Sequence, residues 1–427
     1  MKTLATALFS LILLLAGARI AHAEGNMTMD DAVAIALKRN RDVLATKLDI
    51  EAAQFDRVAA GVYWNPSFSY TAGNIVLGSG NPQDKGLQPG VTSQLVHTIG
   101  VSEVIDVWFK RSARIRAADK GIEHRKLVVE DALREIVHAV RTAFADLVRE
   151  QLESELTRTM KVRYDETVRV STARFKAGEI SEAELGKIEL EGLKYQNALI
   201  DAEMELDLAR ERLASLLGLG SGAQLPGTAV MSNDARTPFS VPVLAKAALQ
   251  DRPDLRAARQ GHDLTDATIE AAKREAYPDI SLGVAVTHSE FQVSGDNPNA
   301  AALTLSLPLP LFDRNQANIG RARVDAKRFE NDVARLELQV QHEVTDAVRR
   351  VDRASTLLDV YEKGMLDRAD RALKVAESAY RAGSSSLIEL LEAQRTYIDT
   401  RAQYLRAQHD YRQAVIDVTY ATHRRAP

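Results

Sequence analysis

Glu389 and Glu392 are the acidic side chains whose spacing could steer a cation. They are three residues apart in a stretch that predicts a helix, so both carboxylates lie on one helix face. In most proteins such a face is only a solvated surface. In a symmetric tube each subunit would contribute the same pair, and the resulting ring would attract cations and repel anions. A solvated face and a charged ring are therefore both open.

No catalytic constellation accompanies these carboxylates. The histidines are dispersed, and neither an HExxH pair, a GxSxG elbow nor a Walker loop occurs. The glycine cluster GLGSG (218–222) follows a predicted helix with no preceding strand, which is typical of a linker. The chain has no cysteine, so thiolate chemistry, disulfides and lipid attachment at a cysteine are excluded. The sequence predicts no enzyme, no cofactor and no resident metal.

Two similar turns separate predicted helices, RFKAGEIS (174–181) and AYRAGSSS (379–386). In each turn a glycine, Gly178 or Gly383, can take the left-handed conformation that ends a helix. The serines Ser181 and Ser386 can then cap the helix that follows. A plain helical hairpin explains these residues fully. A functional interpretation adds that both turns lie at the same end of the molecule, farthest from the predicted strands.

The helices that these turns connect are unusually long. From Ser112 to Arg174 there is no proline, and apolar residues recur in steps of three and four, as in a coiled coil. A helix of this length would span roughly 95 Å. Ala317 to Arg381 repeats the length and the pattern. Shorter returning helices are predicted at Ser181–Leu217 and Ser386–Ala421, and further helices at residues 30–63 and 243–277.

Four segments alternate apolar and small polar residues, which predicts strands at about 66–76, 95–107, 278–289 and 301–310. In LTLSLPL (303–309), for example, the leucines take one face and Thr304, Ser306 and Pro308 take the other. This pattern suits the wall of a membrane barrel and an ordinary half-buried sheet equally well. Because four strands cannot enclose a lumen, a barrel would require several chains.

The chain contains one unit written twice. ALKRNRDVLA (36–45) recurs 212 positions later as ALQDRPDLRA (248–257), and Pro66 and Pro278 follow at the same spacing. The two turns match at a spacing of 205. We therefore predict two repeats, 24–229 and 230–427, each reading helix, two strands, long helix and returning helix. They would intertwine into one functional domain.

The first residues predict export. Lys2 precedes an apolar stretch from Leu4 to Leu15, and Ala21-His22-Ala23 is a small-residue cleavage site, so residues 1–23 are expected to be a signal peptide. The remaining chain has no run of about 18 apolar residues that could span a membrane as a helix. The net charge of −4 and its scattered distribution argue against a nucleic acid partner.

These motifs together resemble the TolC-type outer-membrane factor family, over nearly the whole mature chain. The repeat, the strand pairs and the turn sequences RFKAGEISEAEL (174–185) and AYRAGSSSLIELLEAQ (379–394) carry the resemblance. Three further segments resemble the heavy-metal, CzcC-like branch of that family: YWNPSFSY (63–70), EVIDVWFKRSAR (103–114) and PLPLFDRNQANIGRAR (308–323).

The resemblance implies an α+β membrane protein that forms a homotrimer. Four strands per chain would make a twelve-stranded outer-membrane β-barrel, continued into the periplasm of a Gram-negative bacterium by a long α-helical barrel. The trimer would be the passive outlet of a tripartite efflux pump for divalent heavy-metal cations. Its partners would be a periplasmic adaptor protein, an inner-membrane proton-driven exporter and the lipid of the outer membrane.

The resemblance also assigns roles to residues. The periplasmic entrance would be narrowed by acidic side chains and closed by a tyrosine: Glu389, Glu392, Glu184 and Tyr380. The adaptor would contact the two turns, at Phe175, Gly178, Ser181, Gly383 and Ser386. Ser385 departs from the family pattern, because the best-known member has an arginine there that helps to close the entrance. A serine has no charge to pair with the acidic ring, so we expect a looser closed state.

Three alternatives remain. A multidrug or type I secretion outlet of the same fold would share all of these features. A periplasmic coiled-coil scaffold would share the helices, and solubility without detergent would distinguish it. A periplasmic enzyme would be indicated by turnover that a single His or Glu substitution abolishes.

Overall fold

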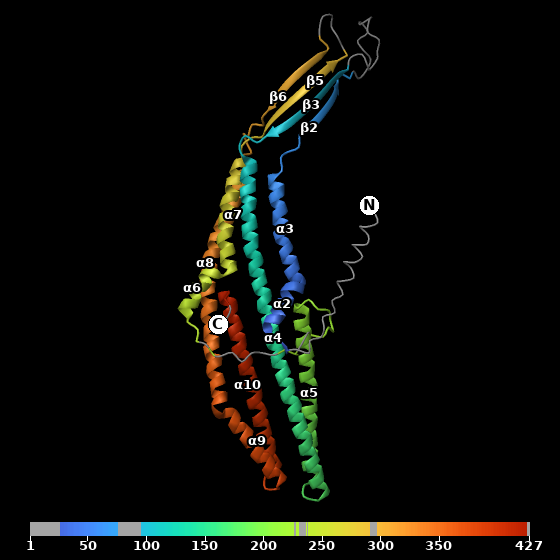
Figure 1. Ribbon diagram of the computed structural model, residues 1–427, viewed down its shortest axis with the longest axis vertical. Coiled ribbons are helices and arrows are strands. Elements are labelled where there is room, and N and C mark those ends of the chain that lie inside the picture. Colours follow the sequence, from blue (N-terminus) through green and yellow to red (C-terminus); the bar gives the residue numbers. More distant parts are fainter. Residues whose placement is uncertain are drawn as a thin grey trace, which may run out of the picture. The chain divides into compact units, whose positions relative to one another are not determined.

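The computed structural model describes residues 26–75, 95–225, 228–229, 236, 238–290 and 297–424 (Figure 1). The predicted signal peptide, residues 1–23, lies outside these ranges. The chain divides into two compact units, each drawn from both halves of the sequence. The strand unit contains Leu48–Val129 and Asp254–Leu336, and the hairpin unit contains Met1–Lys47, Glu130–Pro253 and Glu337–Pro427. None of the described helices is both long and apolar enough to pass through a membrane.

The strand unit holds a four-stranded antiparallel sheet in the order β2-β3-β5-β6 (Figure 1). Its strands are Ser67–Gly73, Val96–Ile105, Ile280–Ser289 and Asn299–Ser306. Val101 lies opposite Phe68 on one side and Val284 on the other, and Val284 lies opposite Leu303. Residues that lie opposite one another share a face of the sheet. The alternation in the sequence therefore becomes one apolar face across all four strands, interrupted by the exposed Glu103 opposite Leu282.

The two faces of the sheet differ in chemistry. On the apolar face, Phe68 is 71% exposed, Leu303 74% and Leu305 70%. The opposite face carries small residues such as Ser69, Gly100 and Thr304. An apolar surface that stays exposed across a whole sheet indicates contact with something other than this chain.

The last strand is shorter than predicted. The alternation predicted a strand to about residue 310, but β6 ends at Ser306. Pro308 and Pro310 have no backbone N–H group and cannot extend the ladder. The alternation of Leu307, Leu309 and Leu311 is thus a pattern without strand pairing.

The long helices form as predicted in the first half of the chain and differ in the second. Helix α4 runs unbroken over Lys110–Lys176, and α5 returns over Glu182–Leu216. The prediction of one equally long helix over residues 317–381 was wrong. There α8 covers Gln316–Val360 and α9 covers Leu366–Arg381, and α10 returns over Leu387–Thr422.

The interruption at Tyr361–Met365 is centred on Gly364, whose φ is +126°. No residue other than glycine adopts this backbone conformation readily. Arg236, from the segment between the two halves, donates to Asp359 at the end of α8 and to Glu362 within the interruption. The break is therefore stabilised by a residue distant in sequence.

The helices before the strands are each divided in two, which the sequence patterns did not predict. In the first half α2 (Met29–Arg39) and α3 (Arg41–Gly61) meet at Asn40. In the second half α6 (Val241–Asp251) and α7 (Pro253–Glu275) meet at Arg252. Pro253 explains the second division, because proline disfavours a helical residue before it and suits the first turn of a new helix.

The two divisions make equivalent contacts. Asn40 Nδ2 donates to the carbonyl oxygen of Leu216 at 2.8 Å, and Arg252 Nη1 donates to that of Ala421 at 3.4 Å. Asn40 and Arg252 are 212 positions apart, and Leu216 and Ala421 are 205 apart, the same two spacings that relate the sequence motifs. Each half thus ties the end of its returning helix to its own first helix pair.

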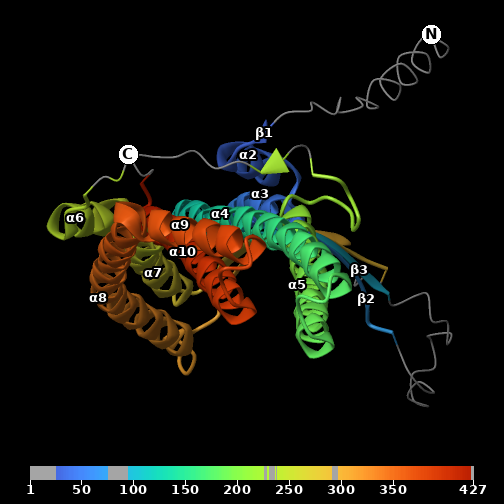
Figure 2. The same ribbon diagram turned by 90° about the horizontal axis from the view of Figure 1, so that it is seen from below.

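A short parallel pairing of β1 (Asn26–Met27) with β4 (Thr228–Ala229) was also not predicted (Figure 2). The side chains of Met27 and Ala229 are buried in an apolar cluster with residues of α2, α4 and α5. Two residues are too few for an alternating pattern, so the sequence carries no detectable signal for either strand.

Candidate functional site

The two turns of the hairpin unit have the predicted backbone. Gly178 has φ +79° and Gly383 has φ +71°. At the first turn the N–H of Glu179 donates to the carbonyl of Arg174, and the N–H of Gly178 donates to that of Phe175, both at 2.9 Å. The second turn repeats both bonds. This is the Schellman ending of a helix, which accounts for the glycine.

The serines after the turns cap the next helices, as predicted. Ser181 Oγ accepts a hydrogen bond from the N–H of Glu184 at 3.2 Å. Ser386 Oγ accepts one from the N–H of Glu389 at 3.3 Å, and the Glu389 carboxylate accepts in return from the N–H of Ser386. The second turn therefore forms a complete capping box, which fixes the direction of the Glu389 side chain.

Tyr380 joins the two hairpins. Its side chain is buried, and its hydroxyl lies 2.9 Å from the hydroxyl of Ser171 on α4, which is also buried. The guanidinium of Arg174 lies 5.0 Å from the centre of the Tyr380 ring and donates to the Tyr380 carbonyl at 3.3 Å. The end of α4 is thereby fastened to the end of α9.

The interior between the hairpins is partly apolar and partly polar. Buried apolar and aromatic side chains form one cluster: Tyr164, Ile188, Tyr380, Leu387 and Leu390. Next to it, Gln394 Nε2 lies 3.4 Å from Thr167 Oγ1, and Arg163 pairs with Glu377 at 3.4 Å. Polar contacts of this kind fix a specific alignment of the hairpins, because each buried polar group needs its partner.

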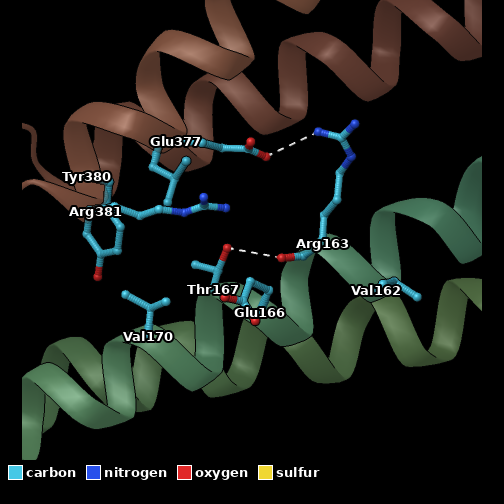
Figure 3. Close-up of a pocket in the computed structure, with 9 residues that line it drawn as sticks. Val162, Arg163, Glu166, Thr167, Val170, Glu377, Tyr380 and Arg381 are labelled. Atoms are coloured by element: carbon cyan, nitrogen blue, oxygen red, sulfur yellow. Dashed lines mark hydrogen bonds and ion pairs between the residues drawn. The ribbon is translucent and has the colours of Figure 1, made fainter.

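A cavity of about 310 Å³ lies between α4 and the α9–α10 hairpin (Figure 3). It is lined by Val162, Arg163, Glu166, Thr167, Val170, Glu377, Tyr380, Arg381 and Leu390. The apolar residues and both charge signs occur together, and no acid–base pair or nucleophile faces a common point. Such a lining suits the side chains of a protein partner better than a chemical reaction.

The predicted entrance carboxylates are accessible. Glu389 and Glu392 are exposed, and Glu184 is half-buried at the start of α5. Within the described chain, the side chains of Glu184 and Glu392 have neither a hydrogen bond nor an ion pair. The hydroxyl of Ser385 donates to Glu389, and this bond, with one from the Ser386 backbone, holds the pKa of Glu389 below its ordinary value. Ser385 thus supplies Glu389 with a hydrogen bond and, as expected of a serine, with no charge.

Among the predicted contact residues, Gly178, Ser181, Gly383 and Ser386 are exposed, and Phe175 is 38% exposed. Ser171 and Arg174 were missed by the sequence analysis. Arg174 stands in the matched turn motif, so its position carried a signal, whereas the role of Ser171 depends on a tyrosine 209 residues away.

Two histidines link helices α4 and α10 through hydrogen bonds to aspartates. His409 bonds Asp146 at 2.7 Å, and His138 bonds Asp417 at 3.1 Å, both between α4 and α10. The hydrogen bond from His409 lowers the pKa of Asp146. No group of three potential metal ligands occurs in the parts of the chain that the structure describes.

The chain is similar to known outer-membrane and metal-resistance proteins. The chain is 23% identical to the cobalt-zinc-cadmium resistance protein CzcC of Cupriavidus metallidurans over 386 residues, which is 90% of this chain and 87% of the relative. It is 24% identical to the pyoverdine export outer membrane protein OpmQ of Pseudomonas putida, over 91% of this chain and 84% of the relative. The crystal structure of the outer membrane protein VceC from Vibrio cholerae superposes with a TM-score of 0.72, covering 93% of this chain and 96% of that one at 18% identity.

The match to a protein family is extensive. Residues 32–219 and 244–422 match the outer membrane efflux protein family, so both halves and nearly all described elements are included. This agrees with the resemblance drawn from the turn and strand motifs, and with their prediction of a transport protein rather than an enzyme. The chain belongs to the outer membrane efflux protein family and acts at the outer membrane.

Proposed function

We propose that three copies of this chain form a passive duct through the outer membrane, through which an efflux pump discharges divalent metal cations. The exposed apolar face of the four-stranded sheet carries this proposal. A barrel in lipid needs an apolar outer face and an inner face of small or polar residues. The sheet has both, over all four strands.

The open edges of the sheet favour assembly from several copies, and the family resemblance implies three. Among the described strands, β2 and β6 each have a partner on one side only. Open strand edges are not tolerated in lipid, so β6 of one copy is expected to pair with β2 of the next. Three copies give twelve strands, enough to enclose a water-filled lumen.

We infer that the chain is internally duplicated and that its two halves contribute similarly to a helical wall. The equivalent hydrogen bonds from Asn40 to Leu216 and from Arg252 to Ala421 support this inference. Each chain would then contribute two similar hairpins to the wall, and three chains would contribute six.

The substrate class rests on similarity. The relative CzcC is named for cobalt, zinc and cadmium resistance, and the motifs at 63–70, 103–114 and 308–323 resemble that branch. The relative OpmQ is named for pyoverdine export at nearly the same identity and coverage, which favours an outlet for organic compounds as the second candidate.

A resistance assay distinguishes the two candidates. Deleting the gene in its own host should lower tolerance to cobalt, zinc or cadmium and raise the metal content of the cells, and the wild-type gene should restore both. Purified protein should also conduct ions in planar bilayers. Unchanged metal tolerance with lost export of an organic compound would replace the first candidate by the second. Absence of any conductance would contradict a duct of either kind.

We infer that the two turns dock a periplasmic adaptor protein, which links the duct to an inner-membrane proton-driven exporter. Both turns are exposed, and the cavity beside them combines apolar floor residues, Val170 and Leu390, with charges of both signs. The link between Tyr380 and Ser171 holds the two turns together as one docking surface.

Changing Gly178 and Gly383 to valine should abolish metal resistance while leaving the trimer in the membrane. A β-branched residue at positive φ costs on the order of 1–3 kcal/mol per site, and the turn would rearrange to avoid it. The measurement is growth at toxic metal concentration together with trimer yield in the outer-membrane fraction.

Gly186→Val is the matched control. Gly186 lies inside α5, has no positive φ, and a Cβ there would meet nothing within 4 Å, as at Gly178. This variant should keep full resistance. Full resistance of the double variant would remove the docking role from the turns.

We infer that Glu389 and Glu392 form the charged ring of the entrance. Threefold symmetry would gather six carboxylates, and the lowered pKa of Glu389 keeps that group ionised at mildly acidic pH. The channel should prefer cations, and divalent cations should block it.

Glu389→Gln with Glu392→Gln should weaken cation preference and cation block in single-channel recordings. The closed state should also loosen, because the capping box at Ser386 loses its charged partner. Glu203→Gln changes a charge in an exposed pair with Arg158 and serves as the control. Unchanged selectivity and block in the double variant would show that both glutamates only solvate the outer wall.

A further inference from the structure

All four connections between strands and helices lie at the same end of the sheet, across the ends of its strands. β2 and β5 begin at this end of the sheet, and β3 and β6 finish there, as the pairing of Ile105 with Ile280 and of Ser281 with Ser306 requires (Figure 1). Each connection carries at least one aromatic residue: Tyr63, Trp64, Trp108, Phe109, Tyr277 and Phe312. Both tryptophans of the chain are among them. We call this set the junction aromatics.

Most of the junction aromatics face outward. Phe312 is 91% exposed, and Tyr63, Trp64 and Phe109 are exposed as well. Trp108 instead stacks on Tyr277 at 4.8 Å and donates to the carbonyl of Pro278. Exposed aromatic rings at one end of a sheet with an apolar face are typical of the level in a membrane where lipid headgroups meet hydrocarbon.

Arg111 lies beside one of these rings. Its guanidinium is 4.2 Å from the centre of the exposed Tyr63 ring, and its Nε donates to the carbonyl of Gly61 at 2.6 Å. Among the described residues, its side chain has no other hydrogen bond, ion pair or ring contact. The two Nη groups of the guanidinium remain available to an anion, and the Tyr63 ring and the Gly61 carbonyl hold the guanidinium in place.

The acidic side chains of the junction are already engaged elsewhere. Asp106 accepts from the backbone N–H groups of Lys110 and Arg111, each at 2.8 Å. Glu275 and Asp279 pair with Lys110, which is buried. Asp313 accepts from the backbone N–H of Asn315 at 2.9 Å. Because none of these described carboxylates bonds the guanidinium of Arg111, its charge is available to a group outside the chain.

We propose that Arg111 and Tyr63 bind the phosphate of an anionic phospholipid headgroup in the periplasmic leaflet of the outer membrane. This proposal rests on the membrane insertion of the sheet proposed above. A lipid fits better than a soluble phosphate, because exposed apolar side chains at the same end of the sheet, Leu309 and Leu311, would cover acyl chains. The site would fix the depth of the barrel and select lipids of negative charge near it.

Fluorescence can test the proposal because both tryptophans lie at the site. The full-length protein is placed in nanodiscs of phosphatidylethanolamine containing one quarter phosphatidylglycerol, with bromine on the chains of one lipid or the other. Brominated phosphatidylglycerol should quench the wild-type fluorescence more strongly than brominated phosphatidylethanolamine at equal mole fraction. One arginine near a lipid surface is expected to enrich the anionic lipid about fivefold.

Arg111→Gln should remove most of this enrichment, and Arg111→Lys should retain a part of it. Arg328→Gln is the matched control, since Arg328 is an exposed arginine of the same unit that pairs with Asp325. It should leave the enrichment unchanged. If Arg111→Gln does not assemble, Arg111→Lys and the wild-type protein still decide the question.

Three outcomes overturn the proposal. The wild-type protein could show equal quenching by both lipids, or the enrichment could persist in Arg111→Gln. It could also vanish when inorganic phosphate replaces chloride at equal ionic strength, which would identify a site for free phosphate. No quenching by either brominated lipid is a different result, because it would contradict membrane insertion and with it the proposed duct.

Discussion

Arginine in place of Leu305 or Val284 is expected to prevent the protein from accumulating as a trimer in the outer membrane. Both side chains lie on the apolar face of the sheet and are exposed, Leu305 on β6 and Val284 on β5. An arginine facing lipid costs about 2–4 kcal/mol near mid-membrane, as expected for Val284 in the middle of β5, and less at Leu305, which lies near the end of β6. Three copies per barrel multiply this cost, so the folded trimer should be lost and metal resistance with it.

Thr304→Arg and Ser281→Arg are the controls. Thr304 directly precedes Leu305, and Ser281 lies three residues before Val284 on β5, so both side chains point to the opposite face. If that face lines a water-filled lumen, an arginine there is solvated and the trimer should form. The measurement is trimer yield in the outer-membrane fraction. Equal yields for all four variants would contradict the assignment of the faces.

Arg252→Met is expected to destabilise the hairpin unit by about 3–5 kcal/mol, the typical cost of removing one partner of a buried ion pair. The Arg252 side chain is only 2% exposed, and it bonds the Glu343 carboxylate and the carbonyl of Ala421. Methionine fills a similar volume but cannot donate a hydrogen bond to either acceptor. Glu343 is one third exposed, so water will reduce the loss toward the lower value.

Arg424→Met provides the comparison, because Arg424 forms an exposed pair with Asp251 at 2.8 Å. An exposed pair contributes about 0–1 kcal/mol. Denaturant unfolding in detergent, followed by helical circular dichroism, measures both values. Adding Glu343→Gln should recover part of the Arg252→Met loss, since it removes the uncompensated charge. Equal stability of the two arginine variants would show that the Arg252 contact does not hold the helix pair.

The sequence by itself determined those features that depend on neighbouring residues. The left-handed turns at Gly178 and Gly383 follow from glycine, and the caps at Ser181 and Ser386 follow from serine hydroxyls within reach of the next backbone N–H groups. Strand alternation and the long seam of α4 are also local. The end of β6 at Ser306 could also have been predicted, because Pro308 and Pro310 cannot pair in a ladder. The alternation of the leucines was followed instead, and it extended the predicted strand too far.

Features that join distant segments were decided only by the tertiary structure. Five glycines lie inside helices without breaking them: Gly121, Gly186, Gly192, Gly261 and Gly320. Gly364 does break its helix, and Arg236 bonds the two carboxylates that precede it, Asp359 and Glu362. The bond from Tyr380 to Ser171 and the solitary Arg111 beside Tyr63 are likewise absent from any local pattern. A hydrogen bond or a missing counter-ion depends on distances across the fold, and residue spacing along the chain contains no such distances.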